Sequence, residues 1–296
     1  MTVSSPETRG VPTASRRVPY ISWVTVAVYG IFSTLFLTGA LLALWKHIPL
    51  WIPVLVNPFV FFFMFIVMHE GLHHTASQVH WINTALGRAA FPYISVIGGF
   101  SAYRYLHNTH HHYTNDPLRD PDYPIVHAHG WRLWWHVIFS DITYFTFYAR
   151  SCVTRPWSTV KKELIEGFCV SLPGAVFLGI LIAATFLHHD PWLVFAVYLI
   201  PHRISVIAMS LIFDVFPHRT ANVPAREDRY RATVMRLGWE WIMLPLWASQ
   251  TYHAIHHLHP AVPFYRYREV WKKNKHLYAE LGVPVVTLFG KSTSIT

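Results

Sequence analysis

Long uncharged, mostly apolar runs dominate the first quarter of the sequence. Residues 18–45 are 28 residues without a formal charge, and residues 48–68 add 21 more after a short break at Lys46-His47. A helix needs about 20 apolar residues to cross a bilayer, and the apolar part of a secretory signal is much shorter. The two runs therefore predict an antiparallel pair of transmembrane helices and not a cleaved leader.

A second pair of apolar runs follows at residues 167–187 and 191–213, separated by the short loop 188–190. The last run contains Pro201-His202-Arg203. A charge inside the hydrocarbon core is costly, so Arg203 is expected either to line a polar cavity or to mark a break in the helix. The four runs together predict an all-α integral membrane protein with four transmembrane helices.

Three mixed segments lie between and after these runs. Residues 80–105 combine apolar stretches with Arg88 and three glycines, and they predict an interfacial or re-entrant segment. Residues 131–150 predict an aromatic amphipathic helix on the membrane surface. Residues 239–247 form an apolar patch in an otherwise soluble-like region, and this patch is expected to press on the membrane.

The distribution of charge predicts the topology and the domain limits. Arginines precede the first run, whereas the loop after it carries almost no charge, so both termini are expected in the cytoplasm. Residues 1–17 are polar and contain two prolines, which predicts a disordered tail. Residues 18–275 are expected to form the membrane domain, and residues 276–296 a C-terminal tail.

The composition agrees with a lipid environment, since 53% of the residues are hydrophobic and only 13% are charged. The net charge of +9 could suggest nucleic acid as a partner. No Lys/Arg-rich run or nucleic-acid motif supports this, so a basic surface facing membrane lipid is favoured. The two cysteines indicate neither a disulfide framework nor a thiolate metal site.

Histidine is unusually frequent, with 21 copies against 15 acidic residues, and it gathers in three short motifs at the expected cytoplasmic end of the spans. Positions i, i+3 and i+4 share one face of a helix, so several imidazoles of one motif can converge on an ion. Neutral imidazole is a good ligand for iron, zinc or copper. The motifs contain His69, His73 and His74; His107, His110, His111 and His112; and His253, His256, His257 and His259.

The first motif, MHEGLHH, also contains the H-E-x-x-H spacing of zinc metalloproteases, in which Glu70 would act as general base. A zinc hydrolase needs three protein ligands and one open position. At least six more clustered histidines are available here, and eight or more nitrogens suit two metal ions. An intramembrane zinc metalloprotease is therefore a remote alternative. A metal transporter is disfavoured as well, because its ligands would line the spans.

The combination of H-x-x-x-H(H) with two H-x-x-H-H motifs, separated by pairs of spans, resembles the three histidine boxes of the membrane fatty acid desaturase superfamily. The resemblance covers roughly residues 20–275 and includes HHHYTNDPLRDPDY around the second box and YHAIHHLHPAVPFYRY around the third. It implies a cytoplasmic cap with two non-haem irons that use dioxygen and external electrons. The implied iron ligands are His69, His73, His107, His110, His111, His253, His256 and His257, with His74 as a further candidate.

The same family uses one more histidine between its second and third boxes. His218 in FDVFPHRT is the candidate because it follows the fourth run, and His202 is a poorer one because it lies inside that run. Ligating imidazoles usually donate their second N–H to a carboxylate or a carbonyl. The carboxylates expected in this supporting role are Glu70, Asp116, Asp120, Asp122 and Asp214. The aspartates beside Pro117 and Pro121 could equally shape turns.

Two stretches, FDVFPHRT and HNTHHHYTNDPLRDPDYP, look most like bacterial and cyanobacterial carotenoid β-ring hydroxylases. The resemblance thus implies hydroxylation of a carotenoid ring C–H bond, with fatty-acyl desaturation as the alternative. No H-P-G-G motif of a fused cytochrome domain lies near either end, so electrons are expected from a separate protein such as a ferredoxin. Such a donor, or anionic lipid, could bind the basic residues Arg219, Arg229, Arg231, Lys272, Lys273 and Lys275.

Overall fold

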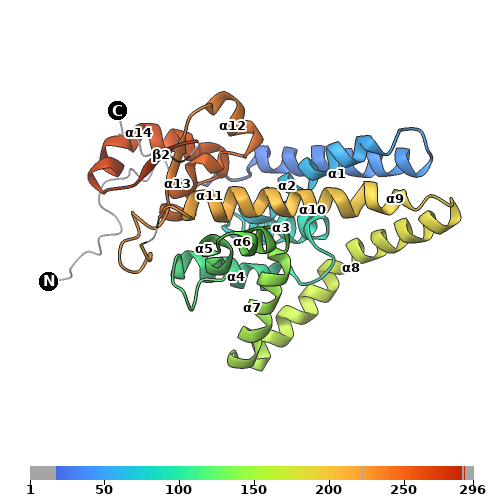
Figure 1. Ribbon diagram of the computed structural model, residues 1–296, viewed down its shortest axis with the longest axis horizontal. Helices are drawn as coiled ribbons and strands as arrows, with labels where there is room; N and C mark the ends of the chain where they lie inside the picture. Colours follow the sequence, from blue (N-terminus) through green and yellow to red (C-terminus); the bar gives the residue numbers. More distant parts are fainter. Residues whose placement is uncertain (1–17, 222, 289, 291–296) are drawn as a thin grey trace.

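The structure is a computed structural model that describes residues 18–221, 223–288 and 290, so the tail expected at residues 1–17 lies outside the described residues. Among the described residues, four helical segments are long and apolar enough to cross a membrane: α1 (Trp23–Leu44), α2 (Trp51–Leu72), α8 (Trp157–Leu187) and the segment Trp192–His218. In Figure 1, α1 and α10 run side by side, α8 runs obliquely below them, and α2 packs against both α1 and α10. The four predicted membrane helices are thereby confirmed by length and composition.

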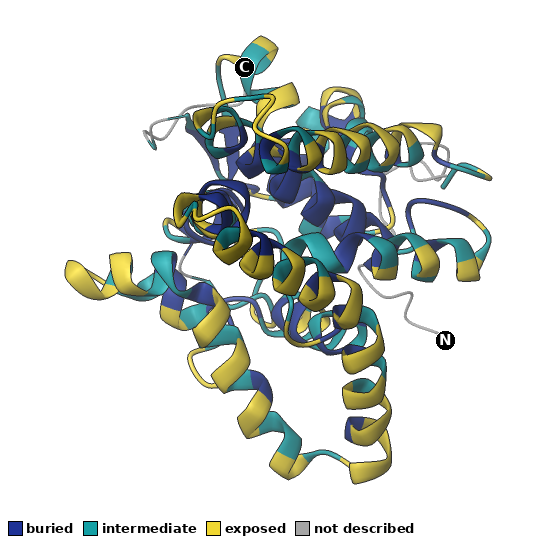
Figure 2. Cartoon of the chain, turned by 90° about the vertical axis from the view of Figure 1, so that its right-hand side faces the viewer, coloured by how far each residue is buried: buried dark blue, intermediate teal, exposed yellow. Residues whose placement is uncertain are grey.

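The outward faces of these helices are apolar. Ile31 on α1, Phe168 and Phe186 on α8, and Trp192 at the start of the last segment are all largely exposed. Figure 2 shows the same pattern, with exposed residues on the outside of the long helices and buried residues where the helices meet. A helix that presents apolar side chains outward is suited to lipid and not to water.

The fourth membrane segment is continuous through Pro201 and Arg203. It consists of α9 (Trp192–Val194), a π-helical stretch (Phe195–Leu199), α10 (Ile200–Met209), a second π-helical stretch (Ser210–Val215) and α11 (Phe216–His218). The alternative of a helix break at Arg203 is wrong. Its guanidinium instead donates to Asp141, at 3.0 and 3.1 Å, and to the carbonyl of Ile138 at 2.6 Å.

The segment expected to be interfacial or re-entrant forms two helices, α3 (His80–Ile94) and α4 (Phe100–Tyr113). A Cβ atom added to Gly99, just before α4, would lie 2.4 Å from the Cα of Gly167 on α8. Only glycine allows this approach, which fixes the start of α4 against α8. Three further helices follow: α5 (Tyr123–His127), α6 (Trp131–Ile138) and α7 (Ser140–Thr154).

The C-terminal part folds back over the end of α2. It contains β1 (Met235–Leu237), α12 (Glu240–Leu246), two 3₁₀ turns (Gln250–Tyr252 and Phe264–Arg266), α13 (His253–Leu258), α14 (Tyr267–Glu280) and β2 (Val285–Thr287). The strands pair in parallel, with Met235 opposite Val285. Tyr278 and Val285 are buried, so the limit expected at residue 275 falls inside a helix of the folded body. Apart from this small sheet, the described fold is helical, as expected.

Candidate metal centre

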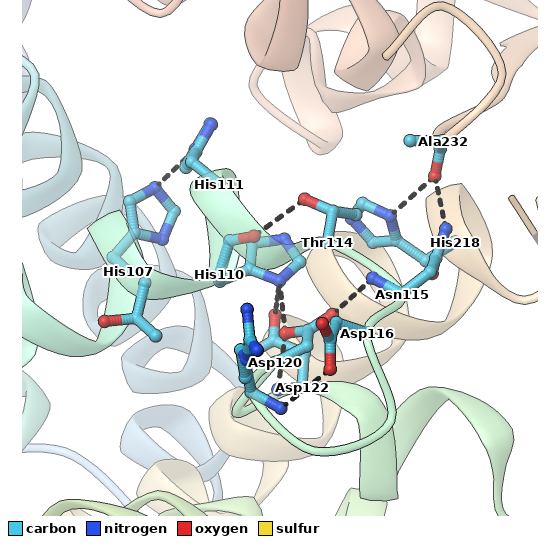
Figure 3. Close-up of polar contacts among 12 residues, drawn as sticks. His107, His110, His111, Thr114, Asn115, Asp116, Asp120, Asp122, His218 and Ala232 are labelled. Atoms are coloured by element: carbon cyan, nitrogen blue, oxygen red, sulfur yellow. Dashed lines mark hydrogen bonds and ion pairs between the residues drawn. The ribbon is translucent and has the colours of Figure 1, made fainter. Parts of the chain in front are cut away.

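Four helices bring the histidine motifs to one place. His69 and His73 lie at the end of α2, where the helix continues one turn beyond the apolar run. The histidines of the second motif lie on α4, His218 ends α11, and His253, His256 and His257 of the third motif lie on α13. Figure 3 shows His107, His110 and His111 on α4 with His218 nearby. Members of all three motifs and His218 therefore come together in one cluster, as the sequence predicts.

The imidazoles form three groups in which the ligand atoms lie within 4.8 Å of one another. One group contains His69, His73, His107 and His256, and another contains His110, His218 and His257. The third group, which contains His111, His256 and His257, shares one member with each of the other two and so joins them. Two groups of three to four imidazoles suit two metal ions better than one.

The Nε2 atoms point inward. Nε2 of His73 lies 2.8 Å from Nε2 of His107, and Nε2 of His257 lies 3.0 Å from that of His253. Nitrogen atoms this close together converge on a small buried volume, where unprotonated Nε2 atoms would direct their lone pairs at an ion. Both ring nitrogens of His69 and Nε2 of His218 have no hydrogen-bond partner within the described chain. Bound cations would satisfy these buried atoms, so the residues fit a metal centre.

The Nδ1 atoms of several rings point outward to protein partners. Nδ1 of His256 lies 3.0 Å from the hydroxyl of Tyr267, and Nδ1 of His253 lies 2.9 Å from Oε1 of Gln250. A ring whose Nδ1–H is held by an acceptor has the tautomer that leaves Nε2 free to bind a metal. No spacing in the sequence points to Tyr267 or Gln250 as partners of the imidazole rings, although both lie close to the third motif.

Asp120 and Asp122 support His110. Oδ1 of Asp120 lies 2.8 Å and Oδ2 of Asp122 lies 3.1 Å from Nδ1 of His110, as Figure 3 shows. Asp120 also accepts from the backbone N–H groups of Asp122 and Asn115 at 2.9 and 2.7 Å. The carboxylate is therefore fixed by the turn that follows α4, and in turn it fixes the ring.

Burial favours neutral imidazoles in most of the cluster. Burial and the neighbouring imidazoles together lower the pKa of His107 and His111 well below 6.5. At His110, burial also lowers the pKa, but Asp122 and Asp120 more than offset it and raise the pKa to about 9. A ligand must be neutral, so metal binding at His110 releases a proton.

The other expected carboxylates are engaged differently. Asp116 accepts from the backbone N–H groups of Leu118 and Arg119 at 2.9 and 3.1 Å, so it shapes the turn. Oε1 of Glu70 accepts from the N–H of Phe264 at 3.1 Å and ties α2 to the segment after the third motif. Asp214 lies on the wall of the cavity described below.

Three of the remaining histidines do not join the cluster. The His74 ring packs against His80, with centroids 4.9 Å apart. Nε2 of His112 lies 2.9 Å from Nη2 of Arg226, and Nε2 of His202 donates to the carbonyl of Ile94 at 2.6 Å. None of these residues belongs to the groups of converging ligand atoms found among the described residues.

An apolar cavity of about 170 Å³ lies beside the cluster. Its walls come from the loop between α3 and α4, from α4 and α7, and from the fourth membrane segment. A smaller cavity connects it to the imidazoles, since both are lined by Tyr103, Tyr144 and Asp214, and the smaller one also by His107 and His253. Ile97 and Phe145, both largely exposed, lie on the lipid-facing side of the larger cavity.

Comparison with known proteins gives a consistent picture. Residues 43–289 match the family described as Fatty acid desaturase. The sn-1 oleoyl-lipid 12-desaturase of Picosynechococcus sp. is 25% identical over 241 residues, which cover 73% of this chain and 66% of that protein. The beta-carotene ketolase of Paracoccus sp. is 25% identical over 206 residues, which cover 69% of this chain and 71% of the ketolase. The matched region thus spans about two thirds of the desaturase.

Proposed function

The chain belongs to the fatty acid desaturase family, and from this premise we propose that it is an oxygen-dependent membrane oxidoreductase that holds two iron ions. The observation that carries the proposal is the pair of imidazole groups with inward Nε2 atoms and orphaned nitrogens on His69 and His218. The proposed ligands are His69, His73, His107, His110, His111, His218, His253, His256 and His257. Bound irons would supply the reduction of dioxygen and the oxidation of an unactivated C–H bond.

The protein groups around the centre have separate tasks in this proposal. Asp120, Gln250 and Tyr267 hold imidazole rings in fixed orientations through their Nδ1 atoms. The apolar walls of the cavity, including Phe65 and Phe213, exclude water and accept a hydrocarbon. Substrate in the larger cavity would reach the imidazoles by passing Tyr103 and Tyr144. The position of its C–H bonds along this path selects the carbon that reacts.

The leading substrate is a carotenoid β-ring, which would be hydroxylated. The stretches around His107–His112 and around His218 support this choice, because they look like those of carotenoid β-ring hydroxylases. The similarity to a protein named beta-carotene ketolase supports it as well. A second candidate function is desaturation of a lipid-linked acyl chain, which the similarity to a lipid 12-desaturase favours equally. Both candidates place a long lipophilic molecule in the same cavity.

The orientation and the electron donor are part of the proposal. We place the metal centre and both termini in the cytoplasm, at the bacterial inner membrane, with electrons supplied by a separate protein such as a ferredoxin. Several of the basic residues considered for docking also have partners within the chain. Arg219 donates to the carbonyl of Ala128, Arg231 to Asp228 and Lys273 to Glu269.

Metal analysis of the purified full-length protein is the first test. About two irons per chain are expected, and one zinc without iron would instead support the protease alternative. The second test is expression in cells that make β-carotene, followed by pigment and acyl-chain analysis, with His110→Ala and His256→Ala as inactive controls. New hydroxylated pigment with unchanged acyl chains supports the leading function. An altered acyl profile with unchanged pigment supports desaturation.

A further inference from the structure

Two donor atoms of Arg104 on α4 are buried and have no acceptor in the described chain. These atoms are Nε and Nη2, whereas the residue as a whole is half-buried. The ring of Phe100 lies beside the guanidinium, with its centroid 4.7 Å from Cζ. Buried donors of a charged group without acceptors are costly, so an acceptor from outside the described chain is expected.

The surroundings of Arg104 carry an excess of positive charge. Arg88 on α3 lies close enough to repel it, and the acidic residue that attracts it is Glu166 on α8. The oxygens of Glu166 are already engaged: Oε1 accepts from Nε of Arg88 at 3.0 Å, and Oε2 accepts from the N–H of Ser101 at 3.1 Å. An anion would satisfy the donors of Arg104 and would also offset this charge.

His74 provides a second buried polar atom at the same place. Its Nδ1 atom has no partner within the described part of the chain, and it interacts electrostatically with Arg104. The residue has a left-handed backbone, with φ of 58°, which turns it away from the metal ligand His73 and places its ring against His80. His74 lies in the turn after α2, Arg88 and His80 lie on α3, and Arg104 lies on α4. The ring contact of His74 with His80, and the electrostatic interactions of Arg104 with His74 and Arg88, link these residues into one cluster.

Trp23, the first residue of α1, and Trp81, in the first turn of α3, are 71% and 69% exposed. Exposed tryptophans are typical of the membrane interface, which would place this cluster near the lipid headgroups. Glu166 directly precedes the uncharged run 167–187 of α8. We propose that Arg88, Arg104, His74 and His80 bind the phosphate group of an anionic membrane lipid, at a site separate from the metal centre. Arginine is well suited to this role because its planar donors match phosphate oxygens.

The test is native mass spectrometry of the delipidated full-length protein, titrated with phosphatidylglycerol, phosphatidylcholine or inorganic phosphate. Wild type is expected to bind one phosphatidylglycerol more tightly than phosphatidylcholine. Arg104→Gln should weaken that binding at least tenfold, and Arg88→Gln should weaken it several-fold. The matched control is Arg150→Gln, which removes the same charge from an exposed position outside the cluster and should bind like wild type.

Metal content and melting temperature of each variant establish that it is folded. If Arg104→Gln is not folded, Arg88→Gln carries the test, because its side chain is 47% exposed and its loss perturbs the core less. Equal affinity of Arg88→Gln, Arg104→Gln and Arg150→Gln for phosphatidylglycerol would overturn the proposal. The proposal that the phosphate belongs to a lipid would be wrong if millimolar inorganic phosphate displaced phosphatidylglycerol and the protein showed no preference among lipids.

Discussion

Replacing Asp120 by asparagine should weaken metal binding without removing a ligand. The carboxylate accepts three hydrogen bonds, from Nδ1 of His110 at 2.8 Å and from the N–H groups of Asp122 and Asn115 at 2.9 and 2.7 Å. Asparagine has one carbonyl oxygen and one NH₂ group, so at least one of these donors would face another donor. A buried hydrogen bond to a charged group contributes about 1.5–3 kcal/mol. Loss of such support lowers metal affinity roughly 10- to 100-fold.

The assay is equilibrium dialysis against graded chelator concentrations, with iron per chain measured by mass spectrometry. The chelator concentration that removes half of the metal should fall by the same 10- to 100-fold in Asp120→Asn. Asp116→Asn is the informative comparison, because this carboxylate accepts only from turn amides, and asparagine can keep those bonds. Equal midpoints for the two variants would refute the view that Asp120 acts through His110.

Three further outcomes are expected. Gly99→Ala should lower stability by about 1–3 kcal/mol, because its Cβ would lie 2.4 Å from the Cα of Gly167. The Cβ of Gly39→Ala would meet nothing within 4 Å, so this control should leave stability unchanged, and thermal melting of both variants makes the comparison. Tyr144→Phe removes a hydroxyl that interacts with the buried Asp122 and Asp214, and it should lower stability by about 1–3 kcal/mol in the same assay while metal content is kept; an unchanged melting temperature would contradict this. In the folded protein, burial lowers the pKa of His107, His111, His253, His256 and His257 well below 6.5, the ordinary value that these residues have in the unfolded chain. Below pH 6.5 the unfolded chain therefore binds more protons, and the melting temperature of the metal-free protein should fall as the pH is lowered from 7.5 to 5.5. His110 and Asp122, with raised pKa values, oppose this trend but are outnumbered.

The sequence predicts the membrane helices well because an apolar run is a local property of the chain. Expected limits of 18–45 and 48–68 compare with helices at Trp23–Leu44 and Trp51–Leu72. The third membrane helix, α8, begins at Trp157, which is earlier than the expected run at residues 167–187. Residues 157–166 are too polar to belong to an apolar run, but they still form helix. The pairing of Arg203 is not visible in the sequence, since its partner Asp141 lies 62 positions away and no local pattern indicates the pair.

The histidine cluster could also be predicted, because a spacing of three or four residues on a helix is visible in the sequence. His218 is a candidate ligand in the sequence because it lies at the end of a span, and in the structure it forms a group with His110 and His257. Gln250 and Tyr267 were missed, since a glutamine or tyrosine that holds an imidazole has no characteristic spacing. Asp116 and Asp120 look alike in the sequence, and only the course of the turn separates their roles.

The groups that hold metal cannot by themselves decide between hydroxylation and desaturation. The chain is 25% identical both to a lipid 12-desaturase and to a beta-carotene ketolase, so global similarity does not choose either. The remaining difference must lie where substrate meets the centre, along the wall that contains Tyr103, Tyr144 and Asp214. These side chains come from α4, α7 and the π-helical stretch of the fourth segment. None of the three is a histidine, although Tyr103 shares α4 with the second histidine motif. Exchanging residues of this wall, while leaving every histidine in place, should therefore change the product without changing the metal content.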